Sequence, residues 1–390
     1  MTQASRALQV PQASLAPEEA GGVDLWLLIP TLALVSLGVA MVYSASIPVA
    51  ASQGGSVLSY LLREVAFVGV GVLGMMGAMR IGLERLAKSA WALLLLTVGL
   101  LVGLFFVPGR NGAHSWYSLG PLSLQPSEMA KLVLVIVTAR YFAHFPRGLS
   151  ARAEAYPPFL VMFLVVGLIA IEPDAGTAAV TFGAMLVYFH VAGARMRHLL
   201  AAGALAAIPA GVLLWHHPYQ VRRIVDFALQ VLGKGRDLEL FGGYQKARSL
   251  IALGSGGLTG CGYCGSVEKY FYLPAATTDS ILAVVGEELG MIATWGVLAL
   301  FGLLVWRGMQ VARRAPDRFS GLVAAGVTAV IAVQALLNIA VVTGSIPATG
   351  VTLPFVSYGG SSLLFSMIGM GLLLNISRRC REPERVGKVP

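Results

Sequence analysis

The sequence predicts an all-α polytopic membrane protein with ten membrane-spanning helices. Of its 390 residues, 56% are hydrophobic and only 12% are charged, whereas a soluble domain carries roughly 25% charged residues. The mean hydropathy is +0.75. A helix needs roughly 20 apolar residues to cross a hydrocarbon core of about 30 Å, and stretches of this kind recur along nearly the whole chain.

Ten stretches meet this criterion, although several are short or contain Gly and Pro. They are residues 25–46, 64–80, 89–107, 128–144, 158–172, 175–192, 197–215, 280–306, 320–343 and 353–377.

Basic residues in alternate loops predict the orientation of the bundle, because Lys and Arg in short loops favour the cytoplasm. Loops 47–62, 173–174 and 344–352 contain no basic residue. Alternate connections carry basic residues: Arg80, Arg85 and Lys88, then Arg140, Arg147 and Arg152, then Arg195 and Arg197, then Arg307, Arg313, Arg314 and Arg318, and finally Arg378, Arg379 and Arg381. The alternation requires an even number of spans and predicts that both termini are cytoplasmic.

The transmembrane domain is expected to cover residues 24–379, flanked by two cytoplasmic tails. Residues 1–23 are rich in Ala, Gln, Ser and Pro without periodicity, which is typical of a disordered segment, and they lack the apolar core of a signal peptide. Residues 380–390 form the second tail. The net charge of +9 reflects the loop pattern, and because there is no soluble basic face with aromatic residues, no nucleic-acid partner is expected.

One connection, residues 216–279, is much longer than the others and is predicted to lie outside, between helices 7 and 8. A structureless loop of this length is uncommon unless it is functional, and the spacing in "VRRIVDFALQVLG" predicts short helices at the outer surface.

Cys261 and Cys264 lie in this loop and are expected to be a pair of thiols or a structural disulfide. Two Cys with no His nearby are too few ligands for a metal site.

Polar residues near the ends of the spans are the first candidates for function. Glu128 and Lys131 are spaced i,i+3 and can form an ion pair. Asp174 precedes a predicted helix and is in the position of an N-cap. The stretch "VSYGGSS", residues 356–362, predicts either close helix packing or irregular backbone that lines a cavity.

The stretch "YLPAATTDSILAVVGEELG" places Asp279 at the entrance of a helix. Either Asp279 supports the helix dipole, with Thr277 or Thr278 as the cap, or it acts on a substrate. Glu287 is about 12 Å further along the axis and rotated by roughly 80°, and Glu288 is on the opposite side. These acids therefore do not form a glycosidase pair, whose carboxyls are about 5 to 9.5 Å apart. A single acid beside a basic loop suits a general base that acts on an anionic substrate.

Four stretches of the sequence together carry a resemblance to a known family. They are "NGAHSWYSLGPLSLQPSEMAK" (111–131), "EPDAGT" (172–177), "GYQKARSLIALGSGGLTGCG" through "YLPAATTDSILAVVGEELG" (243–290) and "NIAVVTGSIPATGVTLPFVSYGGSS" (338–362). In this order they resemble the SEDS family (shape, elongation, division and sporulation), integral-membrane peptidoglycan glycosyltransferases that include FtsW, RodA and SpoVE. Within the family, "KYFYLP" and "PATGVTLPFVSYGGSS" favour the FtsW and SpoVE branch.

The resemblance implies a bundle of ten helices that polymerises lipid II into glycan strands at the outer face of the bacterial cytoplasmic membrane. In this inverting reaction the 4-hydroxyl of an acceptor GlcNAc attacks the anomeric carbon of a donor MurNAc and releases undecaprenyl pyrophosphate. Asp279 matches the essential loop aspartate of the family and is implied to be the general base, because an alcohol is a poor nucleophile until a base accepts its proton.

The resemblance also implies what the site binds. Arg, Lys or a divalent cation, Mg²⁺ or Mn²⁺, would neutralise the leaving group, and no organic cofactor is expected. The partners implied are lipid II, the nascent glycan strand, a class B penicillin-binding protein and other membrane proteins of the divisome or elongasome. Candidate substrate-binding residues are Arg110, Glu128, Lys131, Asp174, Arg222, Arg223, Lys246, Arg248, Lys269, Ser357, Tyr358 and Ser361. For the basic residues of the outer loop, contact with lipid headgroups is the alternative.

The sequence departs from the family pattern at several positions. Ala275 replaces a Glu, Thr277 a His and Ser115 an Arg, while Thr349 stands where FtsW-like members often have Lys. These changes predict altered donor binding or rate. A lipid II flippase and a non-catalytic division scaffold are the alternatives. A flippase needs charge along a path through the membrane, whereas most acids and bases here lie at surfaces or in the outer loop, which favours chemistry at the outer face.

Overall fold

The computed structural model of this chain is a bundle of long helices with one short hairpin. It describes residues 22–107, 115–119, 122–144, 152–172, 174–216, 221, 225, 227, 229 and 242–380. The helices are α1 (Leu25–Ser52), α2 (Val57–Arg80), α3 (Leu83–Leu104), α4 (Pro126–Ala143), α5 (Arg152–Ile171), α6 (Ala175–Val191), α7 (Met196–His216), α9 (Gly242–Ser255), α10 (Ile281–Arg314), α11 (Arg318–Val342) and α12 (Gly360–Arg379). Strands β1 (Tyr117–Leu119) and β2 (Leu122–Leu124) pair antiparallel between α3 and α4.

Six helices in the described part of the chain are long and apolar enough to cross a membrane: α1, α2, α3, α10, α11 and α12. Shorter apolar helices are found at Tyr156–Ile171, Ala175–Val191 and Met196–Pro209. The structure thus confirms a helical, multi-pass architecture, while the number of ten spans remains a prediction.

Several predicted spans have different boundaries: α1 continues to Ser52 rather than ending at residue 46, while α2, α3 and α5 begin at Val57, Leu83 and Arg152 rather than at residues 64, 89 and 158. Helix α10 continues to Arg314 rather than ending at residue 306, and α12 begins at Gly360 because residues 353–359 form an irregular loop. The long connection 216–279 contains α9, whereas the short helices predicted from "VRRIVDFALQVLG" fall mostly outside the described residues. Both predicted tails lie almost wholly outside them as well.

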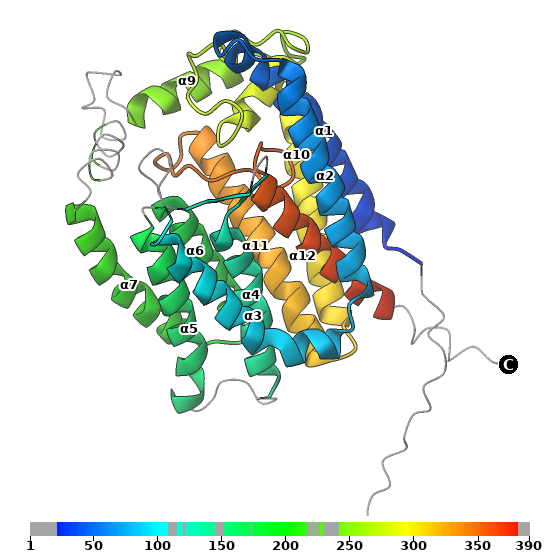
Figure 1. The fold of residues 1–390 in the computed structure, drawn as a ribbon, viewed down its shortest axis with the longest axis vertical. Helices are drawn as coiled ribbons and strands as arrows, with labels where there is room; N and C mark the ends of the chain where they lie inside the picture. Colours follow the sequence, from blue (N-terminus) through cyan, green and yellow to red (C-terminus); the bar gives the residue numbers. More distant parts are fainter. Residues whose placement is uncertain are drawn as a thin grey trace, which may run out of the picture.

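Helices α4, α11 and α12 occupy the middle of the bundle (Figure 1). In the most apolar stretch of each helix, 61% of α11 and 78% of α12 is buried inside the protein, compared with 17% of α2. Helix α12 packs mainly along α2. Small residues allow this close approach, since a Cβ at Gly371 would lie 2.4 Å from the carbonyl oxygen of Met75.

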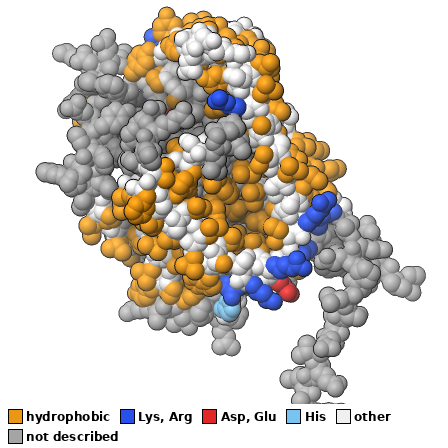
Figure 2. Space-filling view, in the orientation of Figure 1, with side chains coloured by type: hydrophobic (Ala, Val, Ile, Leu, Met, Phe, Trp, Pro, Cys, Tyr) orange, Lys and Arg blue, Asp and Glu red, His pale blue; other side chains and the backbone are white. Residues whose placement is uncertain are grey.

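The bundle has two chemically different ends, which we call the Asp279 end and the Arg307 end. The Asp279 end carries α9 and the loops 256–280 and 343–359 (Figure 1). At the Arg307 end, Asp24 caps α1 and accepts from Arg307 of α10, with an ion-pair distance of 2.9 Å. Figure 2 shows most of the visible Lys and Arg side chains at the end of the molecule opposite α9.

Helix α10 is broken at Gly290, whose φ of 79° and ψ of −177° are non-helical. The loop 257–262 supplies the hydrogen-bond partners that the break leaves missing. Its backbone donates to carbonyls of α10 before Gly290 and accepts from N–H groups of α10 after it. The pairs are Cys261 N–H to Glu287 O (2.9 Å), Gly262 N–H to Glu288 O (3.0 Å), Met291 N–H to Gly257 O (3.0 Å) and Ile292 N–H to Leu258 O (3.2 Å). A Cβ at Gly290 would lie 2.4 Å from the Gly260 nitrogen. Only glycine fits both this φ and this contact.

Candidate active site at the Asp279 end

Asp279 lies just before α10 and is held by neutral donors. Thr278 donates its hydroxyl to Oδ1 at 2.8 Å, and Gln245 of α9 donates its amide to Oδ2 at 3.2 Å. The residue is buried, with 7% of its surface exposed. The N-cap of α10 is Ser280, which makes no side-chain capping bond. The expected cap by Thr277 or Thr278 is therefore wrong, and the Asp279 carboxylate oxygens, which cap no backbone N–H, are left with unused acceptor capacity.

The backbone around Asp279 is fixed by α11 and by the loop before α12. Asn338 donates its amide to the carbonyl of Asp279 at 2.8 Å and to that of Val351 at 2.7 Å. Ser357 donates to the carbonyl of Thr278 at 2.5 Å, and the Tyr358 N–H donates to that of Thr277 at 2.9 Å. Ser357 thus holds the protein backbone rather than facing a ligand.

Helix α9 brings two predicted basic residues beside this site. Lys246 lies over the ring of Phe227, with Nζ 4.9 Å from the centroid. Arg248, one turn after Gln245, lies 5.3 and 4.8 Å from the ring centroids of Tyr244 and Tyr272. It also pairs with Glu268 at 3.2 Å, and 27% of its side chain is exposed. Arg248 therefore combines a fixed position with access to a ligand.

Lys269, by contrast, is not available to a substrate in this structure. Its ammonium group pairs with Glu288 at 2.8 Å and donates to Ser44 of α1 at 2.9 Å and to the Cys264 carbonyl at 2.8 Å. These contacts use all three donors of a lysine, and the side chain is fully buried. The expectation that Lys269 binds substrate needs correction: it anchors the loop to α1 and α10.

Glu287 anchors the same loop. Its carboxylate accepts from the hydroxyl of Ser266 and from the N–H groups of Val267 and Glu268, the latter two at 2.9 and 3.3 Å. Glu287 and Glu288 are both buried. The structure therefore agrees with the sequence argument that neither acid forms a catalytic pair with Asp279.

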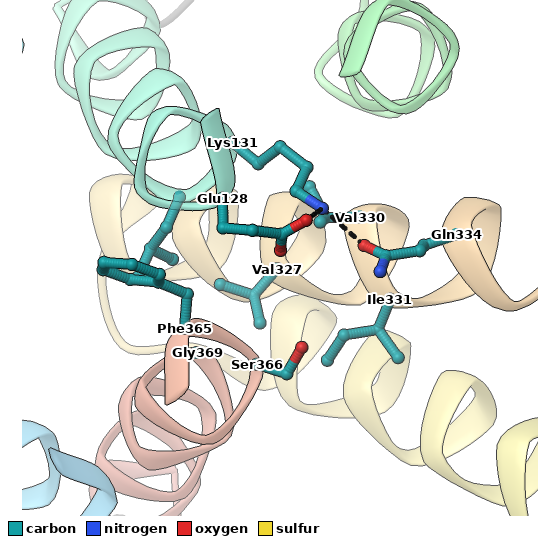
Figure 3. A pocket seen from close by; sticks show the side chains of 10 residues that line it. Glu128, Lys131, Val327, Val330, Ile331, Gln334, Phe365, Ser366 and Gly369 are labelled. Carbon is teal, nitrogen blue, oxygen red and sulfur yellow. Dashed lines mark hydrogen bonds and ion pairs between the residues drawn. The ribbon is translucent and has the colours of Figure 1, made fainter. Parts of the chain in front are cut away.

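A second polar cluster lies inside the bundle (Figure 3). Glu128 and Lys131 of α4 form the predicted ion pair at 2.8 Å, and Lys131 also donates to Gln334 of α11 at 2.6 Å. The amide of Gln334 continues to Thr352 and Ser362, at 3.3 and 3.2 Å. Glu128, Lys131 and Gln334 border a cavity of about 30 Å³ that is otherwise mostly apolar. The cluster thus connects α4 to the loop that holds Asp279 in place.

Asp174 and Ser361 belong to a neighbouring set of contacts. Asp174 caps α6, as predicted, by accepting from the Thr177 N–H at 3.0 Å, and it accepts from the Gln125 amide at 2.8 Å. Ser361 accepts from the Gln125 N–H and donates to the Ser123 carbonyl, both at 2.9 Å. Asp174 and Ser361, both predicted to bind substrate, therefore make contacts within the protein instead. Gln125 is hydrogen-bonded to each of them.

Glu172, in the turn before α6, is buried, and neither of its carboxylate oxygens has a hydrogen-bond partner within the described residues. Burial, together with the nearby charge of Asp174, raises the pKa of Glu172 to about 8. At neutral pH this acid is mostly protonated.

Three predicted residues, Arg110, Arg222 and Arg223, lie outside the described residues. Where the chain is described, no three His, Cys, Asp or Glu side chains gather as a metal site. Cys261 and Cys264 are free thiols, which is one of the two states expected from the sequence.

Comparison with known families agrees with this architecture. The model of the family FtsW/RodA/SpoVE, described as cell cycle proteins, matches residues 25–382. The chain belongs to the FtsW/RodA/SpoVE family.

Individual members of the FtsW/RodA/SpoVE family are similar over almost the full chain. Stage V sporulation protein E of Bacillus subtilis is 38% identical over 364 residues, which cover 92% of this chain and 98% of that protein. A probable peptidoglycan glycosyltransferase FtsW of Halomonas elongata is 40% identical over 375 residues, covering 93% and 92%.

Two solved structures are similar in fold. One comes from work on the structural coordination of polymerization and crosslinking by a peptidoglycan synthase complex. Its matching chain is 28% identical to this one with a TM-score of 0.72, and the match covers 93% of this chain and 99% of that chain. The rod shape determining protein RodA of Thermus thermophilus has a TM-score of 0.67, 28% identity and coverage of 93% and 98%.

Three of the positions that depart from the family pattern make contacts within the protein, two through the backbone carbonyl and one, Ser115, through its side chain. The carbonyl of Ala275 accepts from the N–H groups of Thr278 and Ser280, at 3.1 and 3.2 Å. Ser115 donates to the Glu172 carbonyl at 3.0 Å, and the carbonyl of Thr349 packs against Gly176.

Sequence reasoning missed Gln245 and Asn338, which make the closest polar contacts to Asp279 from other elements. Asn338 could have been found, because an amide within an apolar span must have a partner. Gln245 is on a surface-facing helix of mixed composition, where no local signal distinguishes it.

Proposed function

We propose that this protein is a peptidoglycan glycosyltransferase that polymerises lipid II. The observation that supports this most strongly is the geometry of Asp279. Its carboxylate is held in place by two neutral donors and has no cationic partner among the described residues, so its charge and basicity remain available to a substrate. Family membership and the names of the relatives support the same activity.

In the proposed reaction, Asp279 is the general base. The 4-hydroxyl oxygen of the acceptor GlcNAc forms a bond to the anomeric carbon of the donor MurNAc, with inversion, while its proton passes to the Asp279 carboxylate. The bond from that carbon to undecaprenyl pyrophosphate breaks, and the leaving group takes the electron pair. Arg248, partly exposed and held against two Tyr rings, is the best placed described cation to stabilise this charge.

A divalent cation, Mg²⁺ or Mn²⁺, is part of the proposal. Mg²⁺ in proteins is commonly held by one or two carboxylates together with phosphate oxygens of the substrate. Asp279 is the proposed free base and is not assigned to the ion, and no group of three His, Cys, Asp or Glu gathers among the described residues; the ion would therefore be held mainly by the phosphate oxygens of the substrate and by water. When bound, the ion would neutralise charge on the pyrophosphate.

The membrane arrangement is proposed as well. The protein would lie in the cytoplasmic membrane with ten spans, both termini inside, a transmembrane domain at 24–379 and the Asp279 end outside. The concentration of Lys and Arg away from α9 (Figure 2) supports this orientation. The proposed partner is a class B penicillin-binding protein, by analogy with the synthase complex that resembles this chain.

The test is glycan-strand formation from purified lipid II by the full-length protein in detergent. It is run with its candidate transpeptidase partner and Mg²⁺ or Mn²⁺. The Asp279→Asn variant keeps the shape of the side chain but removes the base, so we expect the rate to fall at least about 100-fold. Asp317→Asn is the matched control, because Asp317 only caps α11 at the other end of the bundle.

Three outcomes are informative. Polymer from the wild type and Asp317→Asn but not from Asp279→Asn supports the proposal. Polymer from all three keeps the enzyme but removes the role of Asp279. No polymer from the wild type with its partner present contradicts the glycosyltransferase and leaves the flippase or the scaffold.

A further inference from the structure

The depth of the loop 257–264 in the bilayer can be estimated from two helices. A hydrocarbon core of about 30 Å corresponds to about 20 helical residues. If one edge of the core lies at the Asp24–Arg307 pair, the other edge falls near residue 45 on α1 and near residue 287 on α10. These two estimates agree, because Ser44 and Glu288 are in direct contact, with Ser44 Oγ donating to Glu288 Oε1 at 2.6 Å.

The loop reaches below this edge on both helices. The Tyr263 hydroxyl donates to the carbonyl of Ala40 at 2.8 Å, four residues deeper than Ser44 on α1, or about 6 Å. On α10, the carbonyl of Leu258 accepts from the N–H of Ile292 at 3.2 Å, which is a similar distance below Glu287. Irregular backbone at this depth requires hydrogen-bond partners, and the broken helix at Gly290 supplies them.

The large exposed side chains of residues 257–272 are apolar or aromatic, and Thr259 is the one small polar side chain exposed among them. Leu258, Tyr263, Val267 and Phe271 are 71%, 49%, 63% and 63% exposed. The two charged residues, Glu268 and Lys269, are turned inward, with side chains 8% and 0% exposed. A loop in water would normally show the reverse arrangement.

The same surface continues onto α10. There Ile292 and Trp295 are 65% and 63% exposed, just beyond the break in a helix apolar enough to span a membrane. Aromatic side chains concentrate where hydrocarbon meets headgroups. We propose that residues 257–272 form a membrane-inserted loop whose exposed side chains occupy the boundary between headgroups and acyl chains in the leaflet at the Asp279 end.

This placement sets the height of Asp279. Ile281 lies six residues before Glu287, so the start of α10 is about 9 Å above the hydrocarbon edge. The diphosphate of a lipid-linked sugar lies at headgroup level and the sugar lies just above it. The inserted loop would thus hold the base at the level of the sugar, a consequence that rests on the proposed function.

The native exposed thiol of Cys261 allows the depth to be measured. An environment-sensitive fluorophore is attached to Cys261 in the full-length Cys264→Ser, Cys380→Ser variant, reconstituted into vesicles of phosphatidylethanolamine and phosphatidylglycerol. Quenching by iodide in water is compared with quenching by lipids that carry a doxyl group near the headgroup or deep in the chain. Two control sites, each in a cysteine-free background, are Gly55→Cys, in the exposed turn between α1 and α2, and Leu95→Cys, which is 73% exposed on α3.

We expect the label at Cys261 to be quenched most by the shallow doxyl lipid, and several-fold less by iodide than the label at Gly55→Cys. The label at Leu95→Cys should respond most to the deep doxyl lipid. Iodide quenching equal to that of Gly55→Cys, without lipid quenching, would place the loop in water and overturn the proposal. Protection from both quenchers would show that protein covers the loop and would overturn it too. Neither result depends on whether the protein polymerises lipid II.

Discussion

Asp279, just before α10, and Glu287 and Glu288, within it, differ in the groups that bind their carboxylates. Asp279 receives hydrogen bonds from Thr278 and Gln245, both neutral, at 2.8 and 3.2 Å. Glu288, nine residues later, is paired with a fully buried Lys269 at 2.8 Å, and Glu287 accepts from Ser266 and two backbone N–H groups.

This difference separates the acid proposed as the base from two acids that hold the structure, within one short stretch of sequence. An acid that is neutralised inside the protein has little charge left for a ligand, whereas one held only by dipoles keeps it. The buried pair in turn fixes the loop that leads to Asp279. We therefore expect changes at Lys269 and Glu288 to affect stability first, and changes near Asp279 to affect the reaction first.

The largest effect on stability is expected from Lys269→Met. It leaves the buried Glu288 without its cation, and breaking a buried pair costs about 3–5 kcal/mol. Thermal unfolding in detergent should show a clearly lower midpoint, while Asp279→Asn stays close to the wild type. The double variant Lys269→Met, Glu288→Gln should regain part of the loss, because no uncompensated charge remains. Equal midpoints for Lys269→Met and the wild type would contradict the structural role of the Lys269–Glu288 pair.

A smaller loss is expected from Gly290→Ala. The backbone conformation of Gly290 is almost restricted to glycine and costs a residue with a Cβ about 1–3 kcal/mol, and the added atom would collide with the backbone of residues 258–260. Gly296→Ala is the matched control on α10, where a Cβ meets nothing within 4 Å, and alanine should stabilise that helix by up to about 1 kcal/mol. Unfolding midpoints that shift in the same direction for both variants would contradict the role of the break.

The smallest effect is expected from Gln245→Leu, which removes one donor to Asp279. Losing a hydrogen bond of about 1–1.5 kcal/mol should slow polymerisation roughly 10-fold with little change in the unfolding midpoint. A rate that falls only together with the unfolding midpoint would show that Gln245 is merely structural.

Some of this arrangement was predictable from the sequence because it depends on local spacing or on composition. The Glu128–Lys131 pair follows from an i,i+3 interval, the cap at Asp174 from its place before a helix, and the multi-pass architecture from apolar length. Asp279 as the base rests on family resemblance and stays a prediction until the polymerisation assay is done.

The rest depends on contacts between distant parts of the chain. Lys269 could be taken for a substrate ligand because nothing near it in sequence shows that Ser44 and Glu288 surround it. Gln245 meets Asp279 only after α9 has docked beside α10. The break at Gly290 could not be predicted from α10 alone, since the partners that repair it are in residues 257–262.

The repaired break in α10 also has a consequence for how the chain enters the membrane. When this helix leaves the ribosome and inserts, two carbonyls before Gly290 and two N–H groups after it have no partners within the helix. The loop 257–262 is synthesised earlier, so the segment that completes these hydrogen bonds is already present when the helix arrives. A circular permutant that began at α10 would have to insert the broken helix first, with four backbone groups unpaired until the last part of the chain was made.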